Sequence, residues 1–261
     1  MHSAAASSVE GIFGVTVSTG SLTTFYADSI DEVGIASGCS TGLVYHHDIV
    51  APVVPTIAPS PASPNKEPKP DFGGTTEGGA SVSVYTSAGC TTGLVGTVSA
   101  QPNGAWSLAD VTVPTNTTTT YYATATDAAG NTSACSTGAA YRHDDVTPAA
   151  PTVSATDPVS PNNDATPDVL GTVAESGLTV RVYASSTCNT AVLATVANAP
   201  LSWRATNVQA VVNGSTTFYA NATDAAGNTS ACSAAGVTYV HENTLPGAPN
   251  TPRATARWVT I

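Results

Sequence analysis

The chain of 261 residues carries 18 Asp and Glu against 7 Lys and Arg, which gives a formal net charge of −11 at pH 7. This balance disfavours nucleic acid and anionic membrane surfaces as partners and favours cations. Every apolar run is too short for a membrane-spanning helix, and residues 1–22 lack the basic start and apolar core of a secretion signal. We therefore expect no membrane insertion, and we expect any export signal to lie outside this sequence.

An internal repeat organises the chain. The twelve residues ATDAAGNTSACS at 125–136 recur without change at 222–233, and a diverged copy, SIDEVGIASGCS, occupies 29–40. The matching residues Asp31, Asp127 and Asp224 lie 96 and 97 residues apart, which is about the size of one β-sandwich domain and longer than helical or propeller repeats. The period predicts full repeats at 53–147 and 148–246, the second half of a repeat at 1–52, and the start of another at 247–261.

Residues 1–52 match the second half of a repeat. TTFYADSID in this segment corresponds to TTYYATATD, and Val15 corresponds to Val111. A half sandwich leaves an apolar face and unpaired strand edges, so we expect this segment to be poorly stable alone. We interpret it as a cut through a longer protein.

Alternating apolar residues place the strands of a full repeat. In the run 120–126, Tyr121 and Ala125 share one face and Thr124 lies on the other. Phe replaces Tyr121 in the other copies, while Asp or Asn replaces Thr124, so the Tyr121 face is the core and Thr124 faces outward. The expected inward residues on earlier strands are Val82, Val84, Trp106 and their equivalents Val180, Val182 and Trp203.

The pattern gives seven strands and no helix in the repeat at 53–147. The expected strands are 53–58, 71–77, 81–87, 93–100, 105–113, 118–127 and 132–142. Seven short strands with frequent turn signals are typical of a Greek-key sandwich. We therefore predict an all-β protein of tandem immunoglobulin-like Greek-key β-sandwiches.

The five cysteines follow the repeat. Each full repeat contains two, Cys90 with Cys135 and Cys188 with Cys232, and Cys39 is left over in the half repeat. We predict two disulfides within domains, each contributing about 2–4 kcal/mol, and expect a partner of Cys39 upstream of residue 1. The alternative is five buried free thiols; zinc is poorly supported because no pair has C-x-x-C spacing. Disulfides at matched positions favour an oxidising compartment, extracellular or at the cell surface.

Three sequence features together resemble a known family. They are G-T-x-E-x-G-x-x-V-x-V-Y, then N-G-x-W, then T-T-x-Y-A-x-A-T-D-A-A-G-N-T-S, and they cover both full repeats and, more weakly, the half repeat. This combination resembles the bacterial immunoglobulin-like (Big) repeats of secreted and surface adhesins. The resemblance implies a rod of stacked domains on the cell surface and does not imply an enzyme.

Acidic residues are expected to gather at the domain junctions. In an immunoglobulin-like domain, the loop between strands two and three and the last hairpin loop lie at the pole where the chain enters. Carboxylate oxygens are ligands that suit Ca²⁺, and members of the family that this sequence resembles hold calcium at such junctions. The candidate ligands are Asp144, Asp145, Glu175, Asp224 and Asn228 at one junction and Asp48, Glu77, Asp127 and Asn131 at the other. The alternative is that Asp127 and Asp224 only cap their turns and the linker acids are solvated.

No catalytic arrangement stands out. His47, His143 and His241 recur once per repeat, too far apart to share a site, and we expect each to be partly exposed at the end of a strand. We predict a non-enzymatic structural or adhesion module, a fragment of a long extracellular repeat protein. The expected partners are neighbouring repeats of the same chain and a host or matrix protein or carbohydrate. The alternatives are a ligand-binding module for carbohydrate or protein, and an accessory domain of a secreted hydrolase.

Overall fold

The computed structural model describes residues 14–245, and these form sixteen β-strands and no helix. The predicted start of a further repeat at 247–261 therefore lies outside the described residues. Contacts divide the chain into two compact units, residues 1–63 with 67–143 and residues 64–66 with 144–261. No helix in the described part could cross a membrane. The all-β prediction is confirmed.

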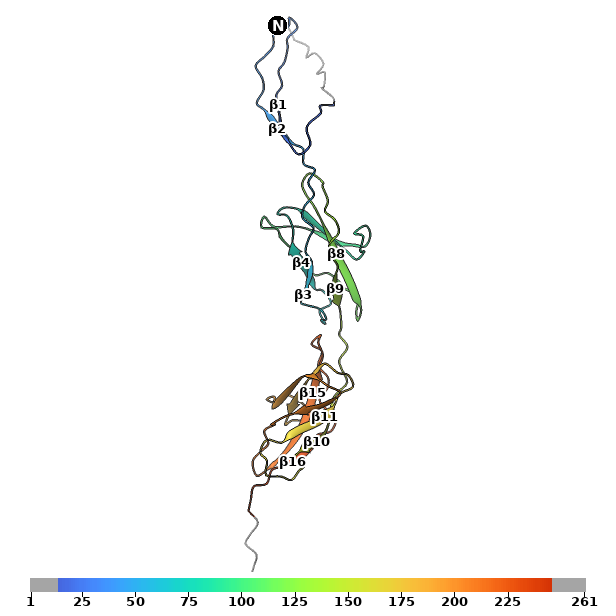
Figure 1. The fold of residues 1–261 in the computed structure, drawn as a ribbon, viewed down its shortest axis with the longest axis vertical. Helices are drawn as coiled ribbons and strands as arrows, with labels where there is room; N and C mark the ends of the chain where they lie inside the picture. The colour runs from blue at the N-terminus through green and yellow to red at the C-terminus, as the bar shows by residue number, and fades with distance from the viewer. Residues whose placement is uncertain (1–13, 246–261) are drawn as a thin grey trace, which may run out of the picture. The chain divides into compact units, whose positions relative to one another are not determined.

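The described part of the half repeat, residues 14–52, contains one antiparallel pair of strands. β1 (Leu22–Phe25) pairs with β2 (Leu43–His46), with Leu22 opposite His46 and Phe25 opposite Leu43. In Figure 1 this pair lies in the blue part of the ribbon.

Two sheets form the sandwich of the first unit. One sheet has the order β3-β4-β7 and the other has the order β6-β5-β8-β9, and all pairs are antiparallel. The chain crosses between the sheets from β4 to β5, from β6 to β7 and from β7 to β8, which is a Greek-key path. The strands are β3 (Ala58–Ser60), β4 (Asp71–Thr75), β5 (Ser81–Tyr85), β6 (Leu94–Ser99), β7 (Ala105–Leu108), β8 (Thr118–Thr126) and β9 (Ala139–Arg142).

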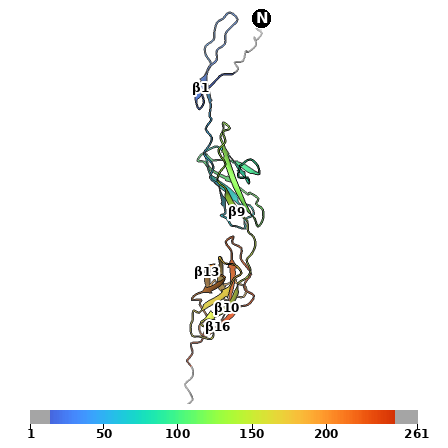
Figure 2. The same ribbon diagram turned by 45° about the vertical axis from the view of Figure 1, so that its right-hand side comes forward.

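The predicted core face of this sandwich is confirmed. Val82, Val84 and Ala125 are fully buried, and Trp106 is 4% exposed. Phe72 of β4 packs against the ring of Tyr121 of β8, with the ring centroids 4.2 Å apart, so aromatic side chains join the two sheets. Figure 1 labels β4 and β8, and Figure 2 shows the same ribbon turned by 45°, with β9 labelled.

The second unit repeats the same topology. Its sheets have the orders β10-β11-β14 and β13-β12-β15-β16. Its core includes Val180, Val182, Trp203 and Phe218, none more than 1% exposed, and Val169 fills the place of Phe72. The strands are β10 (Thr152–Asp157), β11 (Asp168–Thr172), β12 (Leu178–Tyr183), β13 (Ala194–Ala199), β14 (Ser202–Ala205), β15 (Ser215–Thr223) and β16 (Val237–Val240).

One tyrosine on the last strand ties each sandwich together. The Tyr141 hydroxyl donates to the carbonyl of Glu67 at 2.7 Å, and the Tyr239 hydroxyl donates to the carbonyl of Asp164 at 2.7 Å. Both rings are buried, and this burial raises the pKa of each phenol. The hydroxyl bonds join the last strand to the loop that precedes the second strand of its sandwich.

Two of the expected strands have the wrong bounds, one of them beside prolines and the other beside a residue in a left-handed conformation. The first strand is Ala58–Ser60 rather than 53–58, because Pro52 and Pro55 cannot donate to a ladder. The fifth strand stops at Leu108 instead of reaching 113, since Asp110 adopts a left-handed conformation with φ of 54°.

Candidate functional site at the turn and the entering segment

The repeated motif forms a closed turn of five residues, 127–131 in the first unit and 224–228 in the second. The Asp127 N–H donates to the Asn131 carbonyl at 3.0 Å, and the Gly130 N–H donates to the Asp127 carbonyl at 3.2 Å. Gly130 has φ of 92°, a left-handed conformation that favours glycine although the space around it is open. The second unit has the same two bonds at 3.0 and 3.2 Å. We call this segment the Asp-Asn turn.

The aspartate side chain supports the turn from inside. Asp127 Oδ1 accepts the N–H groups of Ala129 and Asn131, both at 2.9 Å. In the second unit, Asp224 Oδ1 accepts the Asn228 N–H at 2.9 Å. The role predicted for the aspartate, hydrogen bonding to local backbone, is therefore present in both turns.

The asparagine side chain reaches from the turn to the chain that enters the repeat. Asn131 Nδ2 donates to Asp127 Oδ2 at 2.8 Å and to the carbonyl of Asp48 at 3.2 Å. Asn228 Nδ2 donates to Asp224 Oδ2 at 3.0 Å and to the carbonyl of Asp144 at 2.8 Å. We call this pair of bonds the amide clamp, and it uses both protons of each amide.

The residue whose carbonyl accepts the clamp bond is the first residue of a small turn in both units. Asp48 Oδ1 accepts the Val50 N–H at 2.9 Å, and Asp144 Oδ1 accepts the Val146 N–H at 3.2 Å. We call residues 48–50 and 144–146 the entering segments. Each entering segment is thus bonded to the Asp-Asn turn through its carbonyl and shaped locally by its carboxylate.

The clamp also affects the charge of the turn. The side-chain amide of Asn131 lowers the pKa of Asp127 below its ordinary value, and the N–H groups of Asn131, Ala129 and Gly130 add to this effect. Hydrogen bonds to a carboxylate favour its ionised form. Asp127 is therefore held as an anion.

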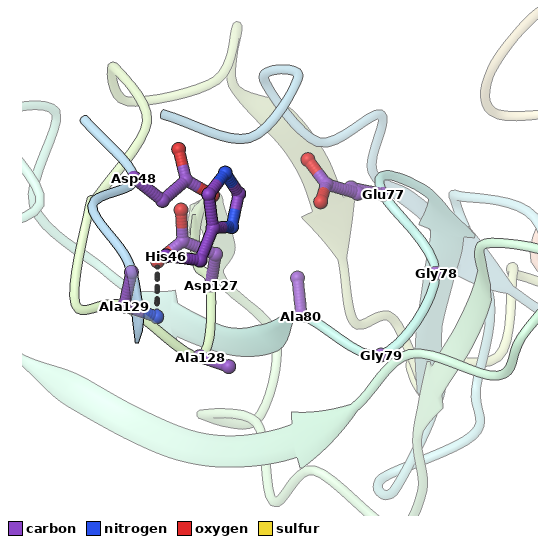
Figure 3. A pocket seen from close by; sticks show the side chains of 9 residues that line it. All are labelled: His46, Asp48, Glu77, Gly78, Gly79, Ala80, Asp127, Ala128 and Ala129. Atoms are coloured by element: carbon purple, nitrogen blue, oxygen red, sulfur yellow. Dashed lines mark hydrogen bonds between the residues drawn. The ribbon is translucent and has the colours of Figure 1, made fainter. Parts of the chain in front are cut away.

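The acids predicted to bind calcium in the first unit line an open cavity. Asp48, Glu77 and Asp127 border it together with His46, and its volume is about 430 Å³. Asp48 and Asp127 lie on one side, and Glu77 lies on the other (Figure 3). In the second unit, Glu175 and Asp145 are exposed, while Asn228 is 5% exposed.

These acids do not form a compact ligand group. Within residues 14–245, no three His, Cys, Asp or Glu side chains are grouped so that they could hold a metal ion. The oxygens of Asp127 already accept three N–H bonds from its own turn. Calcium binding at these positions stays a prediction from the sequence.

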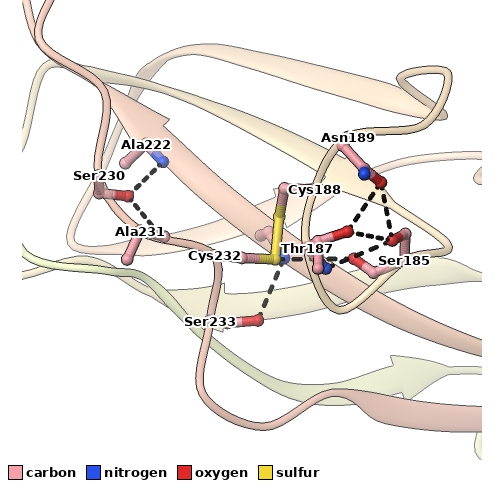
Figure 4. Close-up of a disulfide and its surroundings, with 10 residues drawn as sticks. Ser185, Thr187, Cys188, Asn189, Ala222, Ser230, Ala231, Cys232 and Ser233 are labelled. Carbon is pink, nitrogen blue, oxygen red and sulfur yellow. Dashed lines mark hydrogen bonds between the residues drawn. A yellow bond between two sulfur atoms is a disulfide. The ribbon is translucent and has the colours of Figure 1, made fainter.

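Both predicted disulfides are present. Cys90 and Cys135 are joined with their Cα atoms 5.8 Å apart, and Cys188 and Cys232 are joined at 5.6 Å. Figure 4 shows the second of these beside the segment that follows β15. Cys39 is a free and exposed thiol.

Serines on both sides of Cys135 hold the chain through side-chain hydrogen bonds where the last strand was expected. We call this arrangement the serine ladder. The expected strand 132–142 is wrong over 132–138, because only residues 139–142 form β9. Ser133 and Ser136 instead donate their N–H groups to the carbonyls of Ala125 and Ala123, at 2.8 and 2.9 Å. Their hydroxyl oxygens accept the N–H groups of the same alanines, at 3.0 and 2.9 Å.

The serine ladder recurs in every copy, although sequence reasoning assigned these serines no role. Ser230 and Ser233 bond Ala222 and Ala220 in the same way (Figure 4). Ser37 and Ser40 of the half repeat bond Ser29 and Ala27. The sequence signal that could have indicated this role is the recurrence of the serines at fixed spacing on both sides of the cysteine.

Thr124 lies on the outer face of the sheet, as predicted, but this face is covered there. Thr124 is 7% exposed, and its equivalent Asn221 is 9% exposed. Thr124 lies between the two alanines that bond the serine ladder, so the segment that carries Cys135 runs beside it. The outer face of the sheet is therefore not open to solvent at this position.

The recurring histidines are buried rather than partly exposed in the two intact repeats. His143 is 2% exposed and its Nδ1 accepts the Asn116 N–H at 3.0 Å. His241 is 3% exposed and its Nδ1 accepts the Asn213 N–H at 2.9 Å. The expectation for these two residues is wrong because each is needed as an acceptor for a turn residue with a positive φ.

Comparison with known proteins finds likeness only among solved structures. No protein-family model and no curated protein matches the chain. The FN1–FN3 domains of chicken CNTN1 are 15% identical, with 85% of this chain and 76% of that chain covered and a TM-score of 0.45. The tetra-tandem repeat in the extending region of a large adhesion protein is 24% identical, covers 87% of this chain and 58% of its own, and has a TM-score of 0.30. The titin I-band fragment I67–I69 is 13% identical, with 69% and 65% covered and a TM-score of 0.31.

The fold itself is established by the strand order described above. Each of the two sandwiches has one sheet of three and one sheet of four antiparallel strands, joined by Greek-key crossings. The two sandwiches are therefore immunoglobulin-like domains in tandem. The resemblance to the bacterial Big repeats stays a prediction.

Proposed function

We propose that this chain is a non-enzymatic structural module of an extracellular repeat protein, in which it spaces or presents an adhesive region. The observation that carries the proposal is the recurrence of one assembly at the same positions of both intact repeats. This assembly comprises the Asp-Asn turn, the amide clamp, the serine ladder and the disulfide.

Each part of this assembly restrains the chain rather than presenting reactive groups. The disulfide closes a loop of 44 or 45 residues, and the clamp fixes the segment through which the chain enters. A set of hydrogen bonds and a disulfide that recurs once per domain suits a chain that resists extension, because each repeat of a long chain under tension carries the same force. Catalytic sites, in contrast, are grafted onto a fold at individual positions.

The proposed location follows from the cysteines. Disulfides persist outside the reducing cytoplasm, so the two bridges support an extracellular or cell-surface protein. The proposed partners are neighbouring repeats of the same kind, with a host or matrix protein or a carbohydrate as the target of the adhesive region.

Force spectroscopy on single molecules tests the mechanical role. We expect each unit to unfold in its own step, and we expect reduction to lengthen each step by about 150 Å. This length corresponds to 44 or 45 released residues at about 3.4 Å per residue. The variant with Cys188→Ala and Cys232→Ala is the matched control, because it should show the longer step in the second unit alone without reduction. Extension without discrete steps would contradict a load-bearing role.

A further inference from the structure

The second unit carries an arginine without an ion pair on the outer face of its larger sheet. Val180 and Val182 of β12 point into the core, so Arg181 between them points outward. Its guanidinium donates from Nη1 to Thr223 Oγ1 at 3.0 Å, and it has no carboxylate partner in the described part of the chain. Arg204 of the same unit, in contrast, pairs with two carboxylates. Arg181 therefore keeps hydrogen-bond donors for an anion from outside the chain.

A buried acceptor without a partner lies directly opposite this arginine. Asn221 of β15 is the register partner of Arg181 and is 9% exposed. Its Oδ1 atom is buried and accepts no hydrogen bond from the described residues. An acceptor in this state costs free energy until a donor reaches it. This second observation is independent of the charge, and it indicates a ligand that brings a donor to the side of Arg181.

Two tyrosines extend the same face. Tyr183 and Tyr219 are register partners on β12 and β15, each two residues along its strand from Arg181 or Asn221. The four side chains therefore share the outer face of the sheet. Tyr219 is partly exposed, and its ring covers Gly236, where an added Cβ atom would lie 2.8 Å from Tyr219 Cζ. We call Arg181, Tyr183, Tyr219 and Asn221 the outer patch.

The first unit has the tyrosines of this patch without its polar pair. The same register joins Tyr85 to Tyr122 there. Ser83 and Thr124, also opposite each other, take the places of the arginine and the asparagine. The guanidinium and the amide are thus specific to the second unit, and the first unit is an internal control that lacks both.

The groups of the outer patch fit one chemical class of ligand. A guanidinium binds a carboxylate through two parallel N–H bonds. The Asn221 oxygen can accept a hydroxyl, and the partly exposed Tyr219 ring offers an apolar surface to the C–H face of a pyranose. A sugar that carries a carboxylate has all three features. The net charge of −11 opposes such a ligand only weakly at physiological salt, because exposed charges more than about 8 Å apart are largely screened.

We propose that the outer patch binds a carboxylated sugar, such as a uronic acid unit of a polysaccharide. Arg181 binds the carboxylate, Asn221 accepts a hydroxyl, and Tyr219 packs against the sugar ring. Because Asn221 Oδ1 is shielded from solvent, binding requires a side-chain movement that opens this oxygen. The proposal does not rest on the mechanical role proposed above, so its failure would leave the force measurement unaffected.

A nuclear magnetic resonance titration of the full chain tests this site. The probes are methyl glucuronide, methyl glucoside, which lacks the carboxylate, and glutarate, which lacks the sugar ring. We expect methyl glucuronide to shift the amide signals of Arg181 and Asn221 saturably, with one site per chain. It should bind at least about tenfold more tightly than either of the other probes. The amide signals of Ser83 and Thr124 should not shift.

Substitutions of the arginine separate its charge from its geometry. Arg181→Ser, which reproduces the first unit, should weaken the binding of methyl glucuronide by about tenfold or more. Arg181→Lys should weaken it less, because the charge stays while the two parallel bonds are lost. Arg204→Ser removes the same charge from the other sheet and is the matched control, with unchanged affinity expected. Unchanged amide signals away from the patch verify that each variant is folded.

Any one of four results would overturn the proposal. The first is an absence of saturable shifts at the outer patch. The second and third are equal affinities for methyl glucuronide and methyl glucoside, and equal affinities of the wild type and Arg181→Ser. The fourth is an equal affinity for glutarate, which would show a general anion site in place of a sugar site.

Discussion

Replacing Asn228 by Ala tests the amide clamp in the second unit. The side chain is 5% exposed and makes two hydrogen bonds, one to the carboxylate of Asp224 at 3.0 Å and one to the carbonyl of Asp144 at 2.8 Å. A bond to a charged group contributes about 1.5–3 kcal/mol and a neutral one about 1 kcal/mol, so the unfolding free energy should fall by about 2–4 kcal/mol.

Urea unfolding measures this loss. Trp203 lies in the core of the second unit and reports on it once Trp106 and Trp258 are replaced by Phe. Asn243→Ala, on an exposed side chain of the same unit, is the matched control and should change the free energy by less than about 0.5 kcal/mol.

Hydrogen exchange separates the clamp from a general loss of packing. The Val146 N–H, which donates to Asp144 Oδ1 at 3.2 Å, should exchange faster in Asn228→Ala under conditions where the core strands stay protected. A loss of less than about 0.5 kcal/mol together with unchanged exchange at Val146 would refute the clamp as a stabilising device.

Three further predictions concern other parts of the same assembly. Replacing Cys188 and Cys232 together by Ala should lower the unfolding free energy of the second unit by about 2–4 kcal/mol in the same urea assay. The lowered pKa of Asp127 implies stability that is present above the ordinary pKa of an aspartate and is lost as the pH falls through the folded value, so Asp127→Asn should flatten the acid limb of the first unit's stability curve. His241→Phe leaves the Asn213 N–H without its acceptor and should cost about 1–3 kcal/mol in urea unfolding, whereas His241→Asn, which keeps an acceptor, should cost less.

Patterns that depend on period and alternation could be predicted from the sequence. Val82, Val84 and Tyr121 follow the two-residue alternation of a strand with one buried face, and they are in the core. Cys90 and Cys135 recur in step with the repeat, and they are bonded. These features need only the knowledge that equivalent residues occupy equivalent places.

Features that depend on the direction of one side chain could not be predicted. The sequence did not indicate that the amide nitrogen of Asn131 donates to the carbonyl of Asp48, a residue 83 positions earlier in the chain. Ser133 was expected within a strand, but its hydroxyl oxygen takes the place of a ladder carbonyl. His143 was expected at the surface, but its ring accepts a bond from a loop 27 residues away. In each case the partner of the polar group is set by the folded chain and not by a sequence pattern.

The central claim is that the Asp-Asn turn holds the entering segment through the side-chain amide of its asparagine. The most direct test is the thermal midpoint of the second unit in EDTA and in millimolar Ca²⁺, for the wild type and for Asn228→Ala. We predict a lower midpoint for the variant than for the wild type in EDTA, because both bonds of the clamp form between protein atoms. A midpoint that rises with Ca²⁺ in the wild type and loses this rise in Asp224→Asn would establish the calcium site that the sequence predicts. Equal midpoints for the wild type and Asn228→Ala in EDTA would contradict the amide clamp.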